Sequence, residues 1–295
     1  MTGARSTDTP LVELRDLRYT YLEGTPRTVE ATRGVSFSVR RGERIGLVGP
    51  TQSGKSTVVY ALAHLLRLKE GQVFHEGEDI AAPGYDRAAL RREVGIVFQR
   101  PDFQVLEDVV GKDVAFGPTA AGVPAKETRE RVEESLEAVG LSYPEFRLRY
   151  VHALSGGQKR RVALAGVLAM HAPLLVLDEP MAGLDPRGRK ELFDLFDRLR
   201  EQRDLTMIFC SSSLAETSLL CERLLVLHEG RIVMDGPVNE IVAEADRLRE
   251  IGIALPEPIT LAREMRKVFP DLPADVLTEE ELEEALLAHL GANRA

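Results

Sequence analysis

Cysteine is scarce in this 295-residue sequence, which contains only Cys210 and Cys221. Both stand in apolar surroundings, and their spacing is not that of a metal site, so a cysteine-ligated metal centre is excluded. We expect both to be small residues in or near the core.

Long apolar runs and an excess of positive charge are also missing. No apolar segment is long and uninterrupted enough to span a bilayer, and residues 1–10 lack the basic-then-apolar layout of a secretion signal. The net charge of -9 is opposite in sign to the basic footprint of most nucleic-acid-binding domains. These absences favour a soluble cytoplasmic protein that does not bind nucleic acid.

What is present is an alternation of short apolar runs with helical patterns, which is typical of an α/β fold. The length suits one large or two modest domains. Beyond about Glu244, Pro256 and Pro258 mark a linker. Strands are expected at 11–15, 35–39, 44–48, 93–98, 174–177 and 206–210, with a final hairpin of 224–227 and 231–234. Helical patterns occupy 58–68, 124–154, 158–169, 261–268 and 279–290, the last two forming a helical tail.

The strand at 44–48 leads directly into the motif Gly49-Pro50-Thr51-Gln52-Ser53-Gly54-Lys55-Ser56-Thr57. It matches the P-loop pattern G-x-x-x-x-G-K-[ST] between a strand and a helix. Backbone N–H groups and the helix N-terminus form an anion site there, and glycine lets phosphate approach closely. We expect Lys55 to contact the β- and γ-phosphates of a nucleotide, Ser56 to bind Mg²⁺ and Thr57 to contact the α-phosphate. The alternative is a glycine turn that binds nothing.

Two adjacent carboxylates, Asp178 and Glu179, follow the strand at 174–177. They lie at the carboxyl end of a sheet strand, where open α/β sheets bind ligands. Two acidic residues after a strand are often only a loop, but the P-loop upstream favours a site.

Between these motifs stands Leu154-Ser155-Gly156-Gly157-Gln158. Together with the strand that ends in Asp178-Glu179-Pro180, it resembles the signature loop and Walker B strand of the ATP-binding-cassette (ABC) ATPases. The resemblance implies an α/β fold of the P-loop NTPase class, with a mixed-sheet core, an antiparallel β subdomain and a helical subdomain at about 101–160. The ABC domain would span 1–243, with 244–295 as a C-terminal extension that is a possible dimerisation element. ATP and Mg²⁺ are the implied cofactors.

The resemblance also implies roles for single residues. Asp178 would support Mg²⁺ and Glu179 would polarise the attacking water. Gln99, in the Q-loop at 98–104, would reach both the Mg²⁺ and that water. Asp185 ends the D-loop, Ala182-Gly183-Leu184-Asp185, and would lie near a dimer seam.

Adenine binding must come from outside the P-loop. Tyr21 matches the aromatic residue that stacks on the base in ABC proteins, and such stacking contributes about 1–3 kcal/mol per base in other systems. In the alternative, Tyr19 stacks and Tyr21 packs in the antiparallel sheet, with the two side chains on opposite faces of the strand.

In ABC proteins the signature serves the ATP of a second subunit. Ser155, Gly156, Gly157 and Gln158 stand at the start of the helix expected at 158–169, where N–H groups and the positive helix end face a γ-phosphate. The resemblance therefore implies two ATPase subunits, a second copy or a paralogue, packed head to tail. Basic residues 159–161 are interpreted as a helix surface near phosphate.

Three positions depart from the family pattern. Gln52 stands where ABC P-loops usually have glycine, Met181 where threonine is common, and Ser212 where the switch histidine is expected. Serine lacks the charge and reach of imidazole. The hypothesis is that this chain's own site turns over slowly while its signature serves a more competent partner. In the alternative, Glu179 suffices as the base and Ser212 is tolerated.

Within the ABC family, the segments at 19–26, 98–104, 113–118, 165–170 and 277–282 resemble ATPases of energy-coupling-factor (ECF) importers. That resemblance implies a membrane coupling subunit, a substrate-binding membrane subunit, and a peripheral location on the cytoplasmic face of the cell membrane. The cargo would be a vitamin or a transition-metal ion. Asp102 would pair with an arginine of the coupling helix or, in the alternative, would be a surface carboxylate without a partner. The rival functions are a soluble ABC ATPase not coupled to transport and a non-hydrolytic nucleotide-binding regulator.

Overall fold

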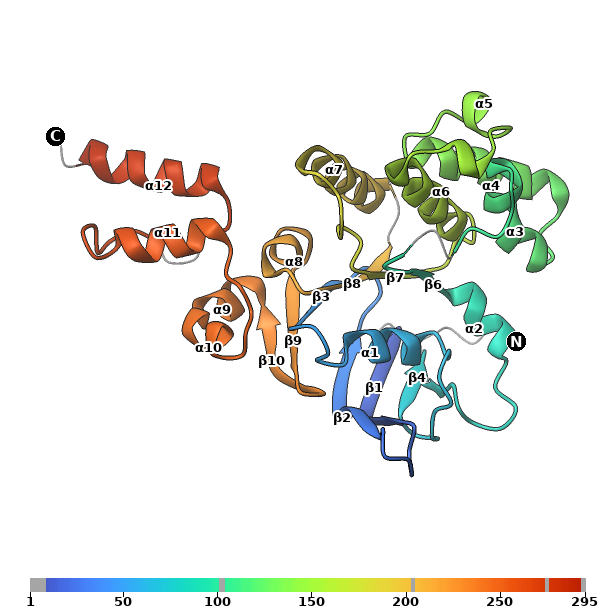
Figure 1. Ribbon diagram of the computed structural model, residues 1–295, viewed down its shortest axis with the longest axis horizontal. Coiled ribbons are helices and arrows are strands. Elements are labelled where there is room, and N and C mark those ends of the chain that lie inside the picture. The colour runs from blue at the N-terminus through green and yellow to red at the C-terminus, as the bar shows by residue number, and fades with distance from the viewer. Residues whose placement is uncertain (1–8, 101–103, 203–204, 274–275, 293–295) are drawn as a thin grey trace.

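The computed structural model describes residues 9–100, 104–202, 205–273 and 276–292, and contains two β-sheets with helix α1 (Lys55–Leu62) between them (Figure 1). The smaller sheet is antiparallel, with strand order β2-β1-β4-β5. Its strands are β1 (Val12–Tyr21), β2 (Val29–Val39), β4 (Val73–His75) and β5 (Glu78–Asp79).

The larger sheet has six strands in the order β10-β9-β3-β8-β7-β6. All neighbours are parallel except the final hairpin of β9 and β10. The strands are β3 (Arg44–Val48), β6 (Val94–Val97), β7 (Leu174–Asp178), β8 (Thr206–Ser211), β9 (Arg223–His228) and β10 (Arg231–Pro237).

Two hydrophobic cores lie on opposite faces of the six-stranded sheet. Successive strand residues point to opposite faces, so Met207 and Phe209 of β8 join one core while Ile208 and Cys210 join the other. The second core contains α1 and the inner face of the antiparallel sheet. Cys210 and Cys221 are both buried free thiols, as expected from the sequence.

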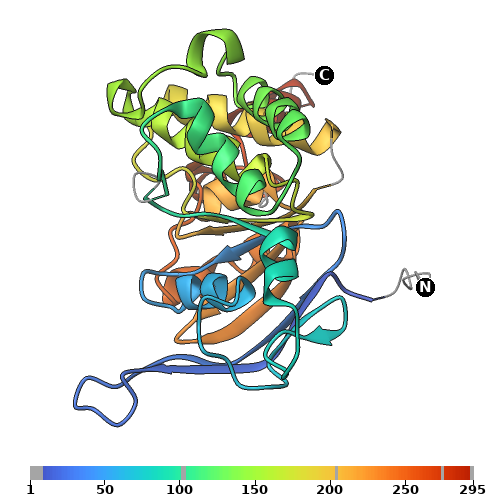
Figure 2. The same ribbon diagram turned by 90° about the vertical axis from the view of Figure 1, so that its right-hand side faces the viewer.

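Helices cover the first core. Those of the helical block are α3 (Val110–Ala120), α4 (Ala125–Ala138), α5 (Tyr143–Phe146) and α6 (Gly156–Leu168), which gather on one side of the molecule (Figures 1 and 2). Helices α7 (Pro186–Gln202) and α8 (Leu214–Leu220) extend the same core. The helix-rich pattern expected at 124–154 is confirmed.

The C-terminal part contains α9 (Val238–Ala243), α10 (Ala245–Glu250), α11 (Glu257–Met265) and α12 (Glu279–Ala292). Helices α11 and α12 lie side by side beyond α9 and α10 (Figure 1). They share a small core of their own, made by Ala262, Val276 and Leu282 with Leu286 against it. Across the described ranges, no helix is both long enough and apolar enough to cross a membrane.

The helix expected at 58–68 is wrong at both ends, because α1 begins at Lys55 and ends at Leu62. Its end is a Schellman motif: the Leu65 N–H donates to the Tyr60 carbonyl and the His64 N–H to the Ala61 carbonyl. His64, at φ +53°, occupies the left-handed position that glycine usually fills. Because no glycine follows Leu62, residue type alone does not indicate where this helix ends. Helices α2 (Arg87–Glu93), α7, α8 and α9 and strands β4 and β5 were not predicted.

The pair Phe196 and Phe209 anchors α7 to β8. Their rings meet edge to face, with centroids 5.1 Å apart, and both side chains are buried. Phe209→Ala is therefore expected to lower the free energy of unfolding by about 3–5 kcal/mol, as measured by urea denaturation. Phe116→Ala, at a half-exposed ring, is the control and should cost less than about 1 kcal/mol. A Phe209→Ala loss as small as that of the control would contradict the assigned packing.

Candidate functional site

The P-loop connects β3 to α1, and Lys55 lies inside its curve. The Lys55 ammonium donates to the Gly49 carbonyl at 2.7 Å and to the Pro50 carbonyl at 3.0 Å. Burial lowers the pKa of Lys55, while the nearby Glu179, Cys210 and Asp178 act in the opposite direction. The loop thus holds a buried cation at the start of a helix, which is an environment for anionic phosphate.

Two P-loop glycines are required by this chain's own packing. A Cβ at Gly49 would lie 2.2 Å from the Leu227 carbonyl oxygen, and one at Gly54 would lie 2.4 Å from that of Ala31. Gln52 has φ +67° and is exposed. Its backbone therefore adopts the conformation for which glycine has no steric cost, and its side chain adds bulk at the mouth of the loop.

Asp178 and Ser56 meet beneath the P-loop. Asp178 ends β7, is 4% exposed, and accepts a hydrogen bond from the Ser56 side chain at the start of α1. Burial, and then Glu179, raises the pKa of Asp178. Mg²⁺ is commonly bound by one or two carboxylates together with substrate phosphates. This pair fits such an ion, and the described residues contain no group of three His, Cys, Asp or Glu that could hold a metal alone.

Glu179 is fixed by the end of β8. Its N–H donates to the Cys210 carbonyl at 2.7 Å. Its two carboxylate oxygens accept from the Ser212 N–H at 2.8 Å and from the Ser211 hydroxyl at 3.1 Å. Glu179 has φ +48°, a conformation that costs about 1–3 kcal/mol in a non-glycine residue. The position expected for a switch histidine therefore lies beside Glu179, and it contacts Glu179 through the Ser212 backbone.

Tyr21 lies beside the first turn of α1, because its hydroxyl is 3.4 Å from the Thr57 hydroxyl. The Tyr19 ring contacts the Tyr21 ring edge to face, at 4.9 Å between centroids. The expectation that the two side chains lie on opposite faces is thus wrong, since residues two apart in a strand share a face. Both rings lie on the same face of β1.

The signature loop starts α6, and that helix begins two residues earlier than expected. Ser155 is its N-cap, and Gly156 and Gly157 are its first helical residues. The Ser155 hydroxyl accepts from the Gln158 N–H at 3.3 Å, and the Gln158 amide oxygen accepts from the Ser155 N–H at 3.0 Å. Gln158 is thus engaged in a capping box. Among the described residues, outside its own helix turn and chain neighbours, a Cβ at Gly156 or Gly157 would meet no atom within 4 Å.

Gln99, the D-loop and the signature line the same cavity. A cavity of about 490 Å³ is lined by Gln99, Arg100, Gly156, Gly157, Arg160, Ala182, Gly183 and Leu184. Asp185 is exposed and caps α7 by accepting from the Gly188 N–H at 2.7 Å. Met181 is fully buried in the core. Asp102 lies outside the described residues.

Several contacts in the site were not expected from the sequence. Arg160 donates to the Pro180 carbonyl at 2.7 Å, and Arg161 contacts the Val139 carbonyl and Glu191. The guanidinium groups of these two residues join α6 to neighbouring elements, while Arg160 also lines the cavity at the signature, so the interpretation of 159–161 as a helix surface near phosphate stays a prediction. Gln104 donates to the Ile96 carbonyl and accepts from the Phe98 N–H, which fixes the start of the Q-loop.

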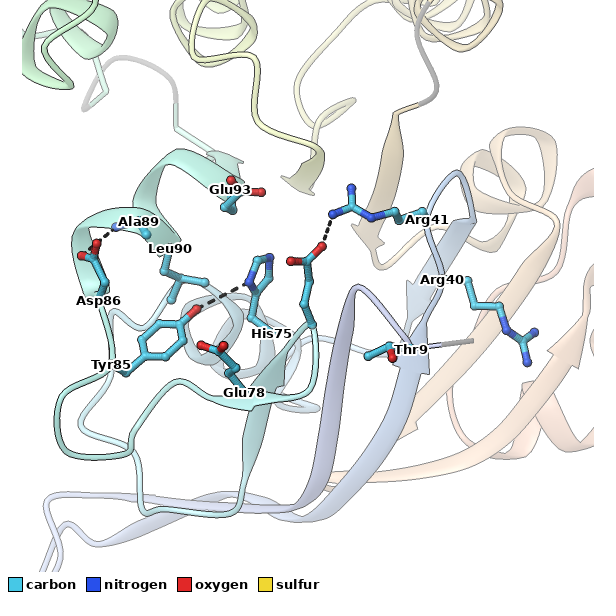
Figure 3. Close-up of a pocket in the computed structure, with 11 residues that line it drawn as sticks. Thr9, Arg40, Arg41, His75, Glu78, Tyr85, Asp86, Ala89, Leu90 and Glu93 are labelled. Carbon is cyan, nitrogen blue, oxygen red and sulfur yellow. Dashed lines mark hydrogen bonds and ion pairs between the residues drawn. The ribbon is translucent and has the colours of Figure 1, made fainter. Parts of the chain in front are cut away.

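A second cavity, of about 600 Å³, lies between α2 and the turns after β2 and β4 (Figure 3). Tyr85 and His75 contact each other there, and Arg41 pairs with Glu76. Arg41 precedes β3 and Glu93 precedes β6, so this cavity lies at the amino ends of the strands. The P-loop and Asp178 are at the carboxyl ends, and the two sites are therefore separate.

Comparison with known proteins agrees with this geometry. The sequence model of the ABC transporter family matches residues 32–182. The chain is 39% identical over 279 residues to the "Energy-coupling factor transporter ATP-binding protein EcfA2" of Caldanaerobacter subterraneus subsp. tengcongensis, covering 95% of this chain and 97% of the relative. It is 41% identical over 281 residues to the "Energy-coupling factor transporter ATP-binding protein EcfA1" of Symbiobacterium thermophilum, covering 94% of this chain and 96% of the relative.

Among solved structures, cbiO1 from Clostridium perfringens, described as part of the ABC transporter complex cbiONQ, superposes with a TM-score of 0.72 at 33% identity. The match covers 84% of this chain and 96% of the other. The expected fold is confirmed, and this chain belongs to the ABC transporter family, within the group of energy-coupling-factor ATPases.

Proposed function

We propose that this ATPase powers an ECF-type importer of vitamins or transition-metal ions from the cytoplasmic face of the cell membrane. The observation that carries the proposal is the convergence of Lys55, Ser56, Asp178 and Glu179 at adjoining strand ends. Together they supply a phosphate-binding cation, two oxygen ligands for Mg²⁺ and a positioned carboxylate.

In this proposal ATP lies over the P-loop, with its adenine stacked on Tyr21. Lys55 leaves the Gly49 and Pro50 carbonyls to contact the β- and γ-phosphates. Ser56, Asp178 and Gln99 would hold Mg²⁺, and the ion would neutralise phosphate charge when bound. Glu179 orients the attacking water and takes its proton, which is general-base catalysis.

We further propose that the signature serves a second ATPase subunit. Gly156 and Gly157 occupy a first helical turn, where each costs about 1 kcal/mol relative to alanine. In the part of the chain that the structure describes, no contact requires glycine at these two positions, in contrast to Gly49 and Gly54. Close approach of a phosphate from another subunit to the free N–H groups of that turn would explain why both positions are glycine. Two chains therefore close head to tail, with Asp185 near the seam.

The chain's own site is proposed to hydrolyse slowly. Ser212 reaches Glu179 only through its backbone N–H, and its exposed hydroxyl cannot supply an imidazole. Gln52 adds a side chain next to the phosphates. In an asymmetric pair this chain would hold ATP for longer and contribute its signature to a faster partner.

Ser212→His tests that asymmetry. Because the Ser212 side chain is exposed, a histidine fits without repacking the core, and it should raise single-turnover hydrolysis at this P-loop by about tenfold. The assay uses the assembled complex, in which the partner's catalytic glutamate is replaced. Ser142→His, at another exposed serine, is the control. No gain over the parent would favour the alternative in which Glu179 suffices.

The membrane partners are proposed to dock on the helical block. Leu106, Leu148 and Tyr150 are more than half exposed there, and a cavity of about 420 Å³ between α3, α4 and α5 is lined by Val109, Ala115, Val132 and Tyr143 among others. An apolar patch of this kind suits a helix of a membrane coupling subunit. That subunit would in turn join a substrate-binding membrane protein.

Purification from membranes distinguishes transport from its rivals. Recovery of the tagged chain with a polytopic coupling subunit is the expected result. Recovery only from the soluble fraction would favour a soluble ABC ATPase, and a pure complex without ATP turnover would favour a regulator.

The segment 244–295 is proposed as a dimerisation element, and its deletion should weaken pairing of the two ATPases.

A further inference from the structure

The hydroxyl of Ser211 lies between two carboxylates. Its oxygen is 3.1 Å from an oxygen of Glu179 and 3.1 Å from an oxygen of Glu216. It also accepts a hydrogen bond from the Ser213 N–H at 3.1 Å. A serine hydroxyl carries a single hydrogen, so Glu179 and Glu216 compete for it.

The other oxygen of Glu216 faces Arg189, which connects Glu216 to the D-loop. The Arg189 guanidinium is 3.7 Å from Glu216, and it also donates to the Leu184 carbonyl at 3.2 Å. The Glu216 side chain is 13% exposed. Burial raises the pKa of Glu216; the hydrogen bond from Ser211 and the charge of Arg189 act in the opposite direction, and Glu179 adds a smaller upward contribution.

We propose that Arg189 and Glu216 are positioning residues that control, through Ser211, how firmly Glu179 is held, and that they tie this control to the D-loop. The proposal rests on the proposed role of Glu179 in hydrolysis. When Arg189 draws Glu216 toward itself, the Ser211 hydrogen serves Glu179. When Arg189 is displaced, Glu216 turns to Ser211 and takes that hydrogen away.

This arrangement gives the D-loop an effect on chemistry at its own P-loop. Arg189 holds the Leu184 carbonyl and Glu216 at once, so a shift of the D-loop on dimer closure changes the distance from Arg189 to Glu216. Ser212 donates to Glu179 only through its backbone N–H, so Ser211 is the one residue in the described structure whose side chain hydrogen-bonds this carboxylate. The orientation of the Ser211 hydroxyl therefore affects Glu179 more in this chain than it would in a site where a histidine side chain also contacts the glutamate.

The test measures single-turnover hydrolysis by the assembled ATPase dimer, with separate determination of ATP affinity. Ser211→Ala and Arg189→Ala are each expected to lower kcat by about tenfold, the effect of one hydrogen bond to a charged group, with KM changed by less than about twofold. Matched controls are Ser218→Ala, whose hydroxyl bonds only within α8, and Arg187→Ala, an exposed arginine of the same turn as Arg189.

A double variant distinguishes control of the Ser211 hydrogen by Arg189 and Glu216 from structural damage to the D-loop. In Arg189→Ala/Glu216→Gln, the glutamine amide can donate to the Ser211 oxygen and leave its hydrogen for Glu179, so kcat should return to within about threefold of wild type. Simple damage to the D-loop would not be rescued. Absence of rescue, or an unchanged kcat in Ser211→Ala, overturns the inference.

Glu179→Gln separates the proposed role of Glu179 from the proposed roles of Ser211 and Arg189. If Glu179→Gln leaves kcat unchanged, the proposed function of Glu179 fails. If it abolishes hydrolysis while Ser211→Ala and Arg189→Ala do not slow it, only the further inference fails.

Discussion

Replacing Glu179 with glutamine is expected to lower kcat at this chain's own P-loop by about 10³-fold, within the range for loss of a positioned general base. Glutamine has the length of glutamate, and its amide oxygen still accepts from the Ser212 N–H, so the conformation after β7 is retained. ATP affinity should change by less than about threefold, since the P-loop contacts are untouched. Pre-steady-state measurement of product formation, with a separate nucleotide-binding titration, checks both quantities.

The matched control is Glu250→Gln, at an exposed position at the end of α10, which should change neither quantity. Equal loss of ATP affinity and kcat would indicate a distorted site instead of a missing base. An unchanged kcat would assign the base to another group.

Gly157→Asp is expected to stop hydrolysis at the partner's site. A carboxylate about 4 Å from a γ-phosphate, at an effective dielectric constant of about 20, is repelled by about 4 kcal/mol, which corresponds to about 10³-fold. A Cβ at this position has no neighbour within 4 Å among the residues that the structure describes, so the variant should fold and bind ATP at its own P-loop normally. Mixed dimers in which only one subunit carries the change give the measurement.

Two alanine variants refine this result. Gly157→Ala should stabilise the isolated chain by up to about 1 kcal/mol through helix propensity and still slow the partner's site. Gly166→Ala, in the same helix, places its Cβ 4.0 Å from Val114 and should stabilise α6 without slowing either site. Hydrolysis by Gly157→Asp dimers at the wild-type rate would contradict the head-to-tail arrangement.

Much of the site could be predicted because its motifs are local. The P-loop is a strand, a turn and a helix in direct succession, and the pattern from Gly49 to Thr57 places Lys55 and Ser56 without knowledge of the rest of the fold. The buried strand before Asp178 places both carboxylates at a sheet edge by the same reasoning.

The rest depends on which strands are neighbours. Ser211 and Glu216 lie beside Glu179 only because β8 pairs with β7, and hydrophobic periodicity carries no information about strand order. The capping box of Gln158 and the left-handed His64 were missed for another reason. Both depend on side-chain or backbone geometry that residue type alone does not fix, because glutamine also serves in binding and histidine is an uncommon helix terminator.

The division of the interior into two cores has a genetic consequence. The P-loop helix belongs to the core shared with the antiparallel sheet, and the signature helix belongs to the core on the other face. In the head-to-tail pair, a mutation that loosens the helical core would first impair the ATP bound by the neighbouring subunit. Lesions in the two cores of this one gene should therefore complement each other when two differently mutated copies are expressed together, provided that the chain pairs with itself.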